Sequence, residues 1–427
     1  MNRLEGARAI VAELARHLEA DLSIELWNGE VLPLGHGARD DIRIRLASPA
    51  AIGRLMRSPK LTTLVAVYVA GGIDIVGASP LDALQRWDHL KAVHLKRNVD
   101  RGLILRAALP FLTARSPTEV GLSFAERVRR IAGRGRDDAA MVQFHYDVSN
   151  AFYGLFLGRE MQYSAGLFAS PDQDLDEAQH AKLDRICRKL ALAPGRRLLD
   201  IGSGWGGLVC HAAQHFGATV HGVTLSQAQL EAAKARAAER GLTGRVTFEL
   251  RDYRTLDRPG GFDAIAQIGM FEHVGLANHD AFFAQVHGLL VPGGLYLHQA
   301  ITRRAPRDLA RFHKRTAYME VINKWIFPGG ELDYIGLTLT NMERFGFEVR
   351  DVESTREHYY LALKAWSERL WARRADAVAE AGEARTRLWL LYFALSAMGF
   401  WRGPICDFQT LAQKKMTGPS GLPLLRG

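Results

Sequence analysis

Apolar and polar residues alternate in short segments over the first quarter of the chain. Apolar residues recur at helical spacing between residues 7 and 22, and the stretch I-R-I-R-L at 42–46 alternates with the period of a strand. Three more elements are expected: a helix at 49–57, a β-rich run at 64–76 and a helix from Pro80. This mixture predicts a small α+β domain over residues 1–115.

A regular alternation of strands and helices begins at Arg196. The predicted strands read R-R-L-L-D-I-G, A-T-V-H-G-V-T, R-V-T-F-E-L-R-D-Y, F-D-A-I-A-Q-I-G and G-L-Y-L-H-Q-A-I-T. Predicted helices start at Gly207, at Ser226 and near His279. Strands joined by helices of this length require right-handed crossovers, so the pattern predicts a doubly wound, mostly parallel sheet. Ligands of such sheets bind beyond the carboxyl ends of the strands.

Residues 116–140 differ from both flanking regions, because they are basic and rich in glycine (R-V-R-R-I-A-G-R-G-R-D-D). Such a stretch is typical of a solvated linker, although its arginines could also meet phosphates. The whole chain carries a formal net charge of +9. That charge favours an anionic partner, either nucleic acid or a phospholipid surface, and does not choose between them.

The cysteines and the apolar stretches bear on the compartment. Cys187, Cys210 and Cys406 are far apart and form no C-x-x-C pair, which argues against a zinc site and a disulfide scaffold. No stretch reaches the roughly 18 uncharged apolar residues of a spanning helix, and the N-terminus lacks a signal-peptide core. We therefore expect a cytoplasmic protein without a metal site.

A glycine-rich turn, L-L-D-I-G-S-G-W-G-G at 198–207, follows the first strand of the alternating region. Gly202, Gly204 and Gly207 fit the dinucleotide pattern G-x-G-x-x-G, so NAD is one candidate ligand. However, Asp200 precedes the glycines, and Thr224 stands near the end of the second strand where a dinucleotide site carries an acid. These features favour S-adenosylmethionine (SAM), although ordinary SAM-dependent methyltransferases also carry an acid at that strand end.

Further motifs occur in a characteristic order: F-H-Y-D-V-S-N-A-F-Y, M-Q-Y-S, H-G-V-T-L-S-Q-A-Q-L, R-D-Y-R, I-G-M-F-E-H-V-G, W-I-F-P-G-G and R-x-W-x-x-Y. Together they closely resemble the cyclopropane-fatty-acyl-phospholipid synthases and the related mycolic-acid cyclopropane synthases. The resemblance covers essentially residue 144 to the end and is less distinct before it. It implies a Rossmann-like SAM-dependent methyltransferase domain over residues 141–427, preceded by the α+β domain.

The same resemblance assigns a cofactor pocket position by position. Tyr163 and Ser164 of M-Q-Y-S would form a lid on SAM, although Tyr163 could also be an aromatic of the core. The other residues implied are Asp200, Gly202, Gly204, Thr224, Gln229, Asp252, Tyr253 and Gly269. Asp252 and Tyr253 would lie near the adenine.

The chemistry implied by the resemblance is alkylation of a lipid double bond. The alkene attacks the sulfonium methyl and leaves a carbocation on the chain, so this step needs positioning and exclusion of water rather than a general base. Aromatic faces could stabilise the cation. An aromatic-rich set precedes the turn and could equally be core: Phe144, Tyr146, Phe152, Tyr153, Phe156 and Phe168.

Ring closure requires a proton to leave the added methyl group, and the resemblance implies that a bound bicarbonate ion takes it. Glu272, His298 and Tyr359 match three of the groups that hold this ion, and the pairing of a Glu with a His, each at a strand end over the crevice, favours a functional role. Ala165 stands where the family has a cysteine, and Ala300 where it has an isoleucine. Two outcomes stay open: ring formation survives, or the cation loses its proton from the chain and gives a methyl branch.

A phospholipid substrate would bring the enzyme to a membrane, since each methylene exposed to water costs about 0.8 kcal/mol. The basic run R-R-A-P-R-D-L-A-R-F-H-K-R at 303–315 is either a contact with an anionic inner membrane surface or a solvated helix face. The resemblance implies lipid binding or homodimer contact for the N-terminal domain. A nucleic-acid methyltransferase is disfavoured because no D/N-P-P-Y turn occurs; a lipid-binding homologue without catalysis is the third class.

Overall fold

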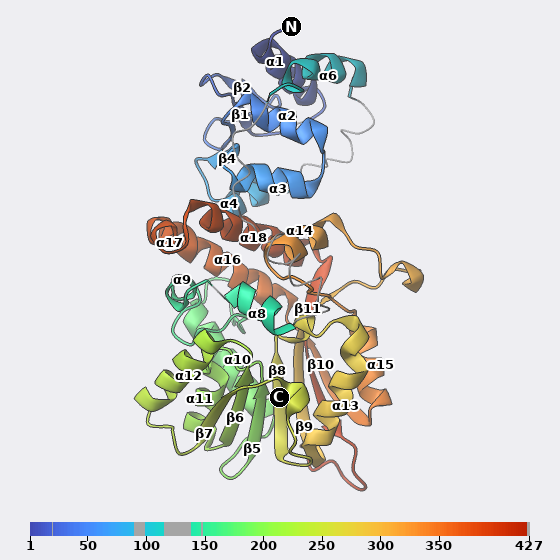
Figure 1. Ribbon diagram of the computed structural model, residues 1–427. Helices are drawn as coiled ribbons and strands as arrows, with labels where there is room; N and C mark the ends of the chain where they lie inside the picture. Colours follow the sequence, from blue (N-terminus) through green and yellow to red (C-terminus); the bar gives the residue numbers. More distant parts are fainter. Residues whose placement is uncertain (19, 89–98, 115–137, 147, 425–427) are drawn as a thin grey trace. The chain divides into compact units, whose positions relative to one another are not determined.

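The computed structural model describes residues 1–18, 20–88, 99–114, 138–146 and 148–424 (Figure 1). The chain divides into two compact units. The first contains Met1–Arg127, Lys314–Ile326 and Trp366–Met398, and the second contains the rest. The sequence-based boundaries differ from this division, because they assigned everything after residue 140 to one domain. Most of the expected linker at 116–140 lies outside the described residues.

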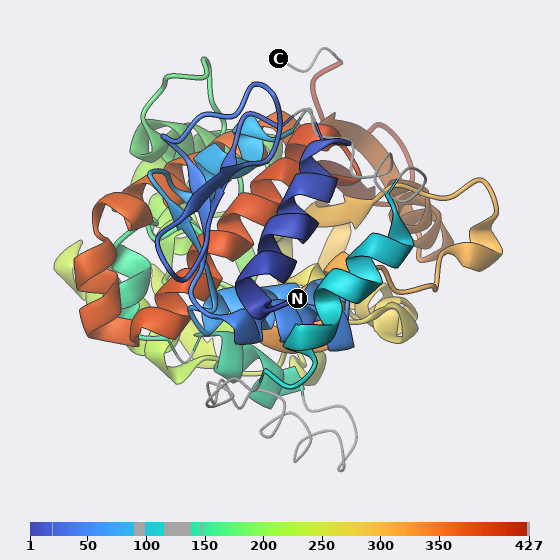
Figure 2. The same cartoon turned by 90° about the horizontal axis from the view of Figure 1, so that it is seen from above.

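The first unit contains a four-stranded sheet with strand order β2-β1-β3-β4. Its strands are β1 (Ser23–Glu25), β2 (Val31–Pro33), β3 (Arg43–Leu46) and β4 (Ile73–Val76). Its N-terminal helices are α1 (Arg3–Ala15), α2 (Pro49–Arg57), α3 (Leu61–Val69), α4 (Pro80–Arg86) and α6 (Arg101–Ala108). The dark blue α1 and the cyan α6 lie side by side in Figure 2. The expected α+β character is therefore present.

The β-rich run expected at 64–76 is wrong over most of its length. Residues Leu61–Val69 (L-T-T-L-V-A-V-Y-V) form helix α3, and only Ile73–Val76 form a strand. The β-branched residues favour a strand only weakly, since packing overrides intrinsic propensity. Val65, Val67, Tyr68 and Val69 are buried, and Gly71, with a φ of +75°, follows the end of the helix. A helix that is apolar on most sides has no clear helical period to detect.

Arg387 connects the segment Trp366–Met398 to the N-terminal part of the first unit. It lies on α18 (Glu383–Arg402), and its guanidinium donates to the carbonyls of Tyr68 and Ile73 at 2.9 and 2.7 Å. It also pairs with Asp74 at 2.9 Å and lies 4.3 Å from the ring centre of Tyr68. Five donors in a planar fork satisfy several acceptors at once. This residue, part of the R-x-W-x-x-Y motif, therefore joins two segments that are more than 300 positions apart.

The second unit is built on a seven-stranded sheet with order β10-β11-β9-β8-β5-β6-β7. Strands β7, β6, β5, β8 and β9 are parallel to one another, and β11 and β10 join antiparallel beside β9. The strands are β5 (Arg197–Ile201), β6 (Thr219–Thr224), β7 (Val246–Leu250), β8 (Phe262–Ile268), β9 (Leu290–Arg303), β10 (Phe347–Ser354) and β11 (Ile405–Lys414). The predicted doubly wound, mostly parallel sheet is confirmed.

Two apolar layers cover the sheet, as the alternation of β5 requires. Leu198 packs into the layer with α10 (Leu175–Lys189) and α11 (Gly207–Phe216), whereas Leu199 packs into the layer with α13 (His279–Leu289). Figure 1 shows α10, α11 and α12 on one side of the sheet, and α13 and α15 on the other. The remaining helices are α8 (Asp138–Tyr146), α9 (Asn150–Gly154), α12 (Gln227–Glu239), α14 (Ala317–Trp325), α15 (Ile335–Arg344), α16 (Arg356–Ala372) and α17 (Arg374–Ala381).

The strand order reverses between β5 and β8, which places a crevice beyond their carboxyl ends. Over the described ranges, no helix combines the length and apolar character needed to cross a membrane.

Candidate active site

The glycine-rich turn connects β5 to α11 through three left-handed residues. Gly202, Gly204 and Gly206 have φ values of +83°, +54° and +79°, which only glycine adopts at little cost. A Cβ on Gly202 would lie 2.9 Å from the Cβ of Met270, and one on Gly207 would lie 2.5 Å from the carbonyl oxygen of Glu160. The lack of side chains at Gly202 and Gly207 therefore lets Met270 and the segment at 160–162 pack closely against the turn.

One cavity lies beyond the ends of β5, β6 and β8. Every residue that the sequence predicts to bind the cofactor lines it: Tyr163, Ser164, Asp200, Gly202, Gly204, Thr224, Gln229, Asp252, Tyr253 and Gly269. Several other residues that line the cavity, including Ser203, Trp205, Met270 and His273, were not predicted from the sequence as ligand contacts. Ser203 and Trp205 lie within the glycine turn, so the turn itself was the signal that could have found them.

The floor of the cavity carries a buried acid. Asp200 is 3% exposed, and burial raises its pKa to about 7, while the charge of Lys182 opposes that rise. A cation placed beside Asp200 would stabilise its ionised form, as the ammonium and sulfonium of SAM can. The buried hydroxyl of Ser203 also has no hydrogen-bond partner within the described part of the chain. These residues fit the amino-acid end of SAM.

The segment at 161–164 closes one side of the cavity. Met161 has a φ of +48°, an uncommon conformation for a residue with a side chain. The Tyr163 ring stacks on His145, with ring centres 5.6 Å apart, and lies 5.6 Å from the ring of Tyr153. Thus Tyr163 both lines the cavity and packs in an aromatic cluster, which combines the two roles considered for it.

Of the other aromatic residues named from the sequence, Tyr146 also lines the cavity. Phe152, Tyr153 and Phe156 are fully buried core residues. The aromatic-rich stretch therefore supplies both core and cavity.

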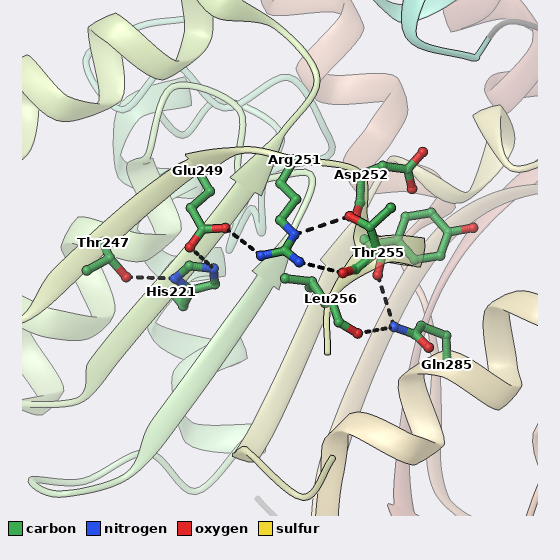
Figure 3. A network of polar contacts seen from close by, with 9 residues as sticks. His221, Thr247, Glu249, Arg251, Asp252, Thr255, Leu256 and Gln285 are labelled. Atoms are coloured by element: carbon green, nitrogen blue, oxygen red, sulfur yellow. Dashed lines mark hydrogen bonds and ion pairs between the residues drawn. The ribbon is translucent and has the colours of Figure 1, made fainter. Parts of the chain in front are cut away.

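The loop that carries Asp252 and Tyr253 is fixed by hydrogen bonds from α13 and from neighbouring loop residues (Figure 3). Gln285 on α13 donates to the carbonyls of Tyr253 and Leu256 at 3.1 and 2.8 Å. Arg251 donates to the Thr255 hydroxyl at 3.1 Å, and that hydroxyl donates to the carbonyl of Asp252 at 2.9 Å. The loop therefore has a defined backbone before any ligand binds.

A polar chain extends this support toward the outer strands. Figure 3 shows the Glu249 carboxylate between Arg251 and His221, at 3.3 and 3.6 Å. Thr247 contacts the other ring nitrogen of His221 at 2.7 Å. Thr224, at the end of β6, donates to the Gln229 side-chain oxygen at 2.9 Å.

Glu272 does not line the cavity, although its chain neighbours Met270 and His273 do. One carboxylate oxygen accepts a hydrogen bond from the backbone N–H of Ile301 at 2.6 Å. The other oxygen is buried without a partner in the described residues. Burial raises the pKa of Glu272 to about 7. The protonated and ionised forms of this carboxyl are therefore both populated near neutral pH.

His298 also lies outside the cavity lining. It sits within β9 rather than at its end, because pairing with β11 extends β9 to Arg303. Nδ1 is 2.8 Å from the Tyr296 hydroxyl, and the buried Nε2 has no partner among the described atoms. Burial lowers the pKa of His298 to about 3, so the ring is neutral at physiological pH.

The remaining members of the expected ion site are buried apolar or aromatic positions. Tyr359 on α16 is 8% exposed and stacks on Phe400, with ring centres 4.4 Å apart. Ala165 and Ala300 are buried. The structure thus brings the ten cofactor residues together in one cavity, whereas Glu272, His298 and Tyr359 lie outside its lining and their shared role stays a prediction.

Comparison with known proteins identifies the class. The model of the mycolic acid cyclopropane synthetase family matches residues 134–410, so the chain belongs to this family. A probable fatty acid methyltransferase of Pseudomonas putida is 35% identical over 412 residues, covering 96% of each chain. The tuberculostearic acid methyltransferase UfaA1 of Mycobacterium tuberculosis is 37% identical, covering 64% of this chain and 65% of that protein.

Solved structures agree. The cyclopropane synthase MmaA2 from Mycobacterium tuberculosis matches with a TM-score of 0.62 and 31% identity, covering 66% of this chain and all (100%) of that one. The mycolic acid cyclopropane synthase CmaA1, complexed with SAH and CTAB, matches with a TM-score of 0.61 and 34% identity, covering 65% and 99%. The chain is therefore a SAM-dependent methyltransferase, and the resemblance noted from its motifs is confirmed.

Proposed function

We propose that the enzyme transfers a one-carbon unit from SAM to the double bond of an unsaturated acyl chain of a membrane phospholipid. The observation that carries this proposal is the aromatic wall of the cavity. The Tyr146 ring lies 6.5 Å from that of Tyr163 and 5.8 Å from that of Trp205, and all three line the cavity. Such rings stabilise a transient cation and exclude water. The names of relatives, fatty acid methyltransferase and cyclopropane mycolic acid synthase, support an acyl-chain substrate.

In this proposal, SAM supplies an electrophilic methyl group and the alkene is the nucleophile. The residues of the cavity bind, orient and shield, since no proton has to be removed in that step. Proton removal afterwards falls to the region of Glu272 and His298, where a bound bicarbonate ion would be the acceptor. Their two unpaired buried atoms support an anion or water there, because buried polar atoms are rarely left without partners.

The alternative product is a methyl branch. Ala165 offers no hydrogen bond where the family cysteine would contact the ion, a loss of roughly 0.5 to 1.5 kcal/mol. A relative named as a tuberculostearic acid methyltransferase favours this candidate. A non-catalytic lipid-binding homologue is the remaining class, and its test is whether the protein turns over SAM at all.

Deuterium in the transferred methyl group shows where the proton leaves: from the added carbon, as in a cyclopropane or a methylene product, or from the chain. With SAM carrying a fully deuterated methyl, ring formation removes one deuterium from the added carbon, whereas branching by proton loss from the chain retains all of them. The matched variant is Ala165→Cys. If the missing contact favours branching, this variant shifts the product toward the ring and makes that product depend on bicarbonate.

Peripheral contact with the inner membrane surface is part of the proposal. The run at 303–315 supplies exposed Arg304, Arg307 and Arg311, with Leu309, 51% exposed, between the last two. Each basic residue near an anionic surface contributes about 1 kcal/mol. Only Leu309–Arg311 form a short 3-10 turn, so the alternative of a solvated helix face loses support.

Co-sedimentation with anionic and zwitterionic vesicles tests this contact. Arg307→Gln with Arg311→Gln should reduce binding to anionic vesicles several-fold, whereas Arg188→Gln, an exposed arginine of α10, should not. Equal binding of all three proteins would contradict the assignment. The expectation of a homodimer is tested by light scattering on the same protein.

A further inference from the structure

Lys182 is a buried lysine directly behind the M-Q-Y-S segment. It lies on α10 and is 1% exposed. Its Nζ lies 2.9 Å from the Ser164 hydroxyl oxygen and 3.0 Å from the Gln162 side-chain oxygen. No carboxylate of the described residues lies within ion-pair distance of it. Burying an ammonium group is costly, so a buried lysine without a carboxylate partner calls for a role.

The direction of these hydrogen bonds is set by chemistry. In its charged form Lys182 is only a donor, so both oxygens then accept from it. The Ser164 hydroxyl, having accepted there, has its own hydrogen left to donate elsewhere. Gln162 is fixed in the same way, since its amide nitrogen donates to the carbonyl of Glu160 at 3.2 Å. Both residues line the cavity, whereas Lys182 does not.

A second side chain of α10 reinforces this arrangement. Gln179, one turn before Lys182, donates to the backbone carbonyl of Ser164 at 3.0 Å. Ser164 is therefore held at its carbonyl and at its hydroxyl by one helix. The hydrogen of its hydroxyl then stays available to donate to a ligand.

The charges around Lys182 come from two strands. Burial lowers the pKa of Lys182 to about 7, while the carboxylates of Asp407 on β11 and Asp200 on β5 act in the opposite direction. Asp407 is already engaged, accepting from Gln299 at 2.7 Å and from Thr355 at 2.6 Å. Asp200 lines the cavity. The cavity is thus lined by an acid, Asp200, and by the Ser164 hydroxyl, which is hydrogen-bonded to the basic Lys182 behind it.

We propose that Lys182 is a positioning residue that holds the Ser164 hydroxyl as a hydrogen-bond donor for the carboxylate of the cofactor's amino-acid end. The proposal rests on the cofactor assignment of the cavity. An amino-acid group carries an ammonium and a carboxylate on neighbouring atoms, which matches an acid and a proton-donating hydroxyl backed by a lysine. Lys182 acts through Ser164 and does not itself touch the ligand.

Two ligands separate positioning from simple support of the lid. S-adenosylhomocysteine carries the amino-acid end, and 5′-methylthioadenosine shares the adenosine and sulfur but lacks it. Calorimetry of Lys182→Met should show about ten-fold weaker binding of S-adenosylhomocysteine, the size expected for one charge-assisted hydrogen bond. Binding of 5′-methylthioadenosine should be unchanged. Arg188→Met is the matched control, because Arg188 is exposed on the same helix, where it pairs with Asp184. This variant should bind both ligands like the wild type.

Two outcomes overturn the proposal, and a third overturns the assignment on which it rests. An equal loss for both ligands would mean that Lys182 only supports the fold of the lid, and no loss for either would mean that it is not needed. Failure of the folded wild type to bind S-adenosylhomocysteine would instead overturn the cofactor assignment itself.

A second variant keeps the test usable if Lys182→Met does not fold. Ser164→Ala should lose S-adenosylhomocysteine affinity to a similar extent, and the double variant should lose little more, because the two residues act in one chain. Lys182→Arg, which keeps a donor, should recover part of the affinity. The wild type should bind S-adenosylhomocysteine more tightly than Lys182→Met, and this difference should shrink as pH rises above about 7. Asp200 and Asp407 titrate in both proteins, whereas only the wild type has a lysine charge to lose. An additive double variant would contradict the proposal.

Discussion

The cofactor cavity and the pair of Glu272 and His298 hold their polar atoms in different ways. In the cavity, Thr224, Gln229, Ser164 and the 252–256 loop have hydrogen-bond partners within the protein. In the pair, one atom of each residue is bound and the other is buried without a partner among the described residues. The first region is organised before its ligand arrives except at the Ser203 hydroxyl, whereas in the second region a further group is needed to satisfy one atom of each residue.

The largest effect should come from a side chain added to the glycine-rich turn that lines the cavity. Gly202→Val places side-chain atoms against Met270 at a left-handed backbone position, so we expect loss of S-adenosylhomocysteine binding by more than about 100-fold in calorimetry. Gly195→Val is the control, because its φ is +87° but no atom lies within 4 Å of the added Cβ. If both variants bind alike, backbone strain rather than the cavity explains the loss.

The next effect concerns the unpaired carboxyl. Burial raises the pKa of Glu272 to about 7, above its value of about 4.3 in the unfolded chain. The stability gained from the protonated form is complete below about pH 4.3 and is lost as pH rises through about 7. Glu272→Gln, which stays neutral and still accepts from Ile301, should gain on the order of 3 kcal/mol over the wild type between pH 4 and 8.

Chemical unfolding at several pH values, in buffers free of bicarbonate, measures this difference. The exposed Glu239→Gln on α12 should leave the pH dependence unchanged. A Glu272→Gln curve parallel to that of the wild type would contradict the account, because it would show that folding does not raise the pKa of this carboxyl.

A smaller effect is expected from the support of the adenine side. Gln285→Leu removes both hydrogen bonds to the carbonyls of Tyr253 and Leu256 and should weaken S-adenosylhomocysteine and 5′-methylthioadenosine equally, by about three- to ten-fold. Gln227→Leu, whose amide faces Glu231 on an exposed surface, is the control. A loss confined to S-adenosylhomocysteine would contradict the placement of the loop at the adenosine end.

Much of the cofactor site was predictable because its signals are local. The turn after β5, Asp200 before it and Thr224 at the end of β6 all follow from strand ends that the apolar pattern marks, and parallel strands bring such ends to one edge. The helix α3 was not predictable, since its β-branched residues favour a strand until burial decides.

The position of Lys182 and the contacts between distant segments could not be predicted from the sequence for a different reason. In sequence, Lys182 is one lysine of a charged amphipathic helix, and only the fold brings it behind Ser164 and near Asp407, more than 200 positions later. Arg387 likewise finds its acceptors on a segment at the other end of the chain. Such contacts depend on the complete sheet and leave no local period to detect.

The most direct measurement of the central claim is a comparison of two vesicle preparations that differ only in one double bond. The purified protein is incubated with SAM and either mono-unsaturated or fully saturated anionic phospholipid, and the acyl chains and head groups are weighed by mass spectrometry. The account predicts the gain of one methylene unit on the unsaturated acyl chain alone. Transfer to the saturated lipid, to a head group or to neither would contradict it.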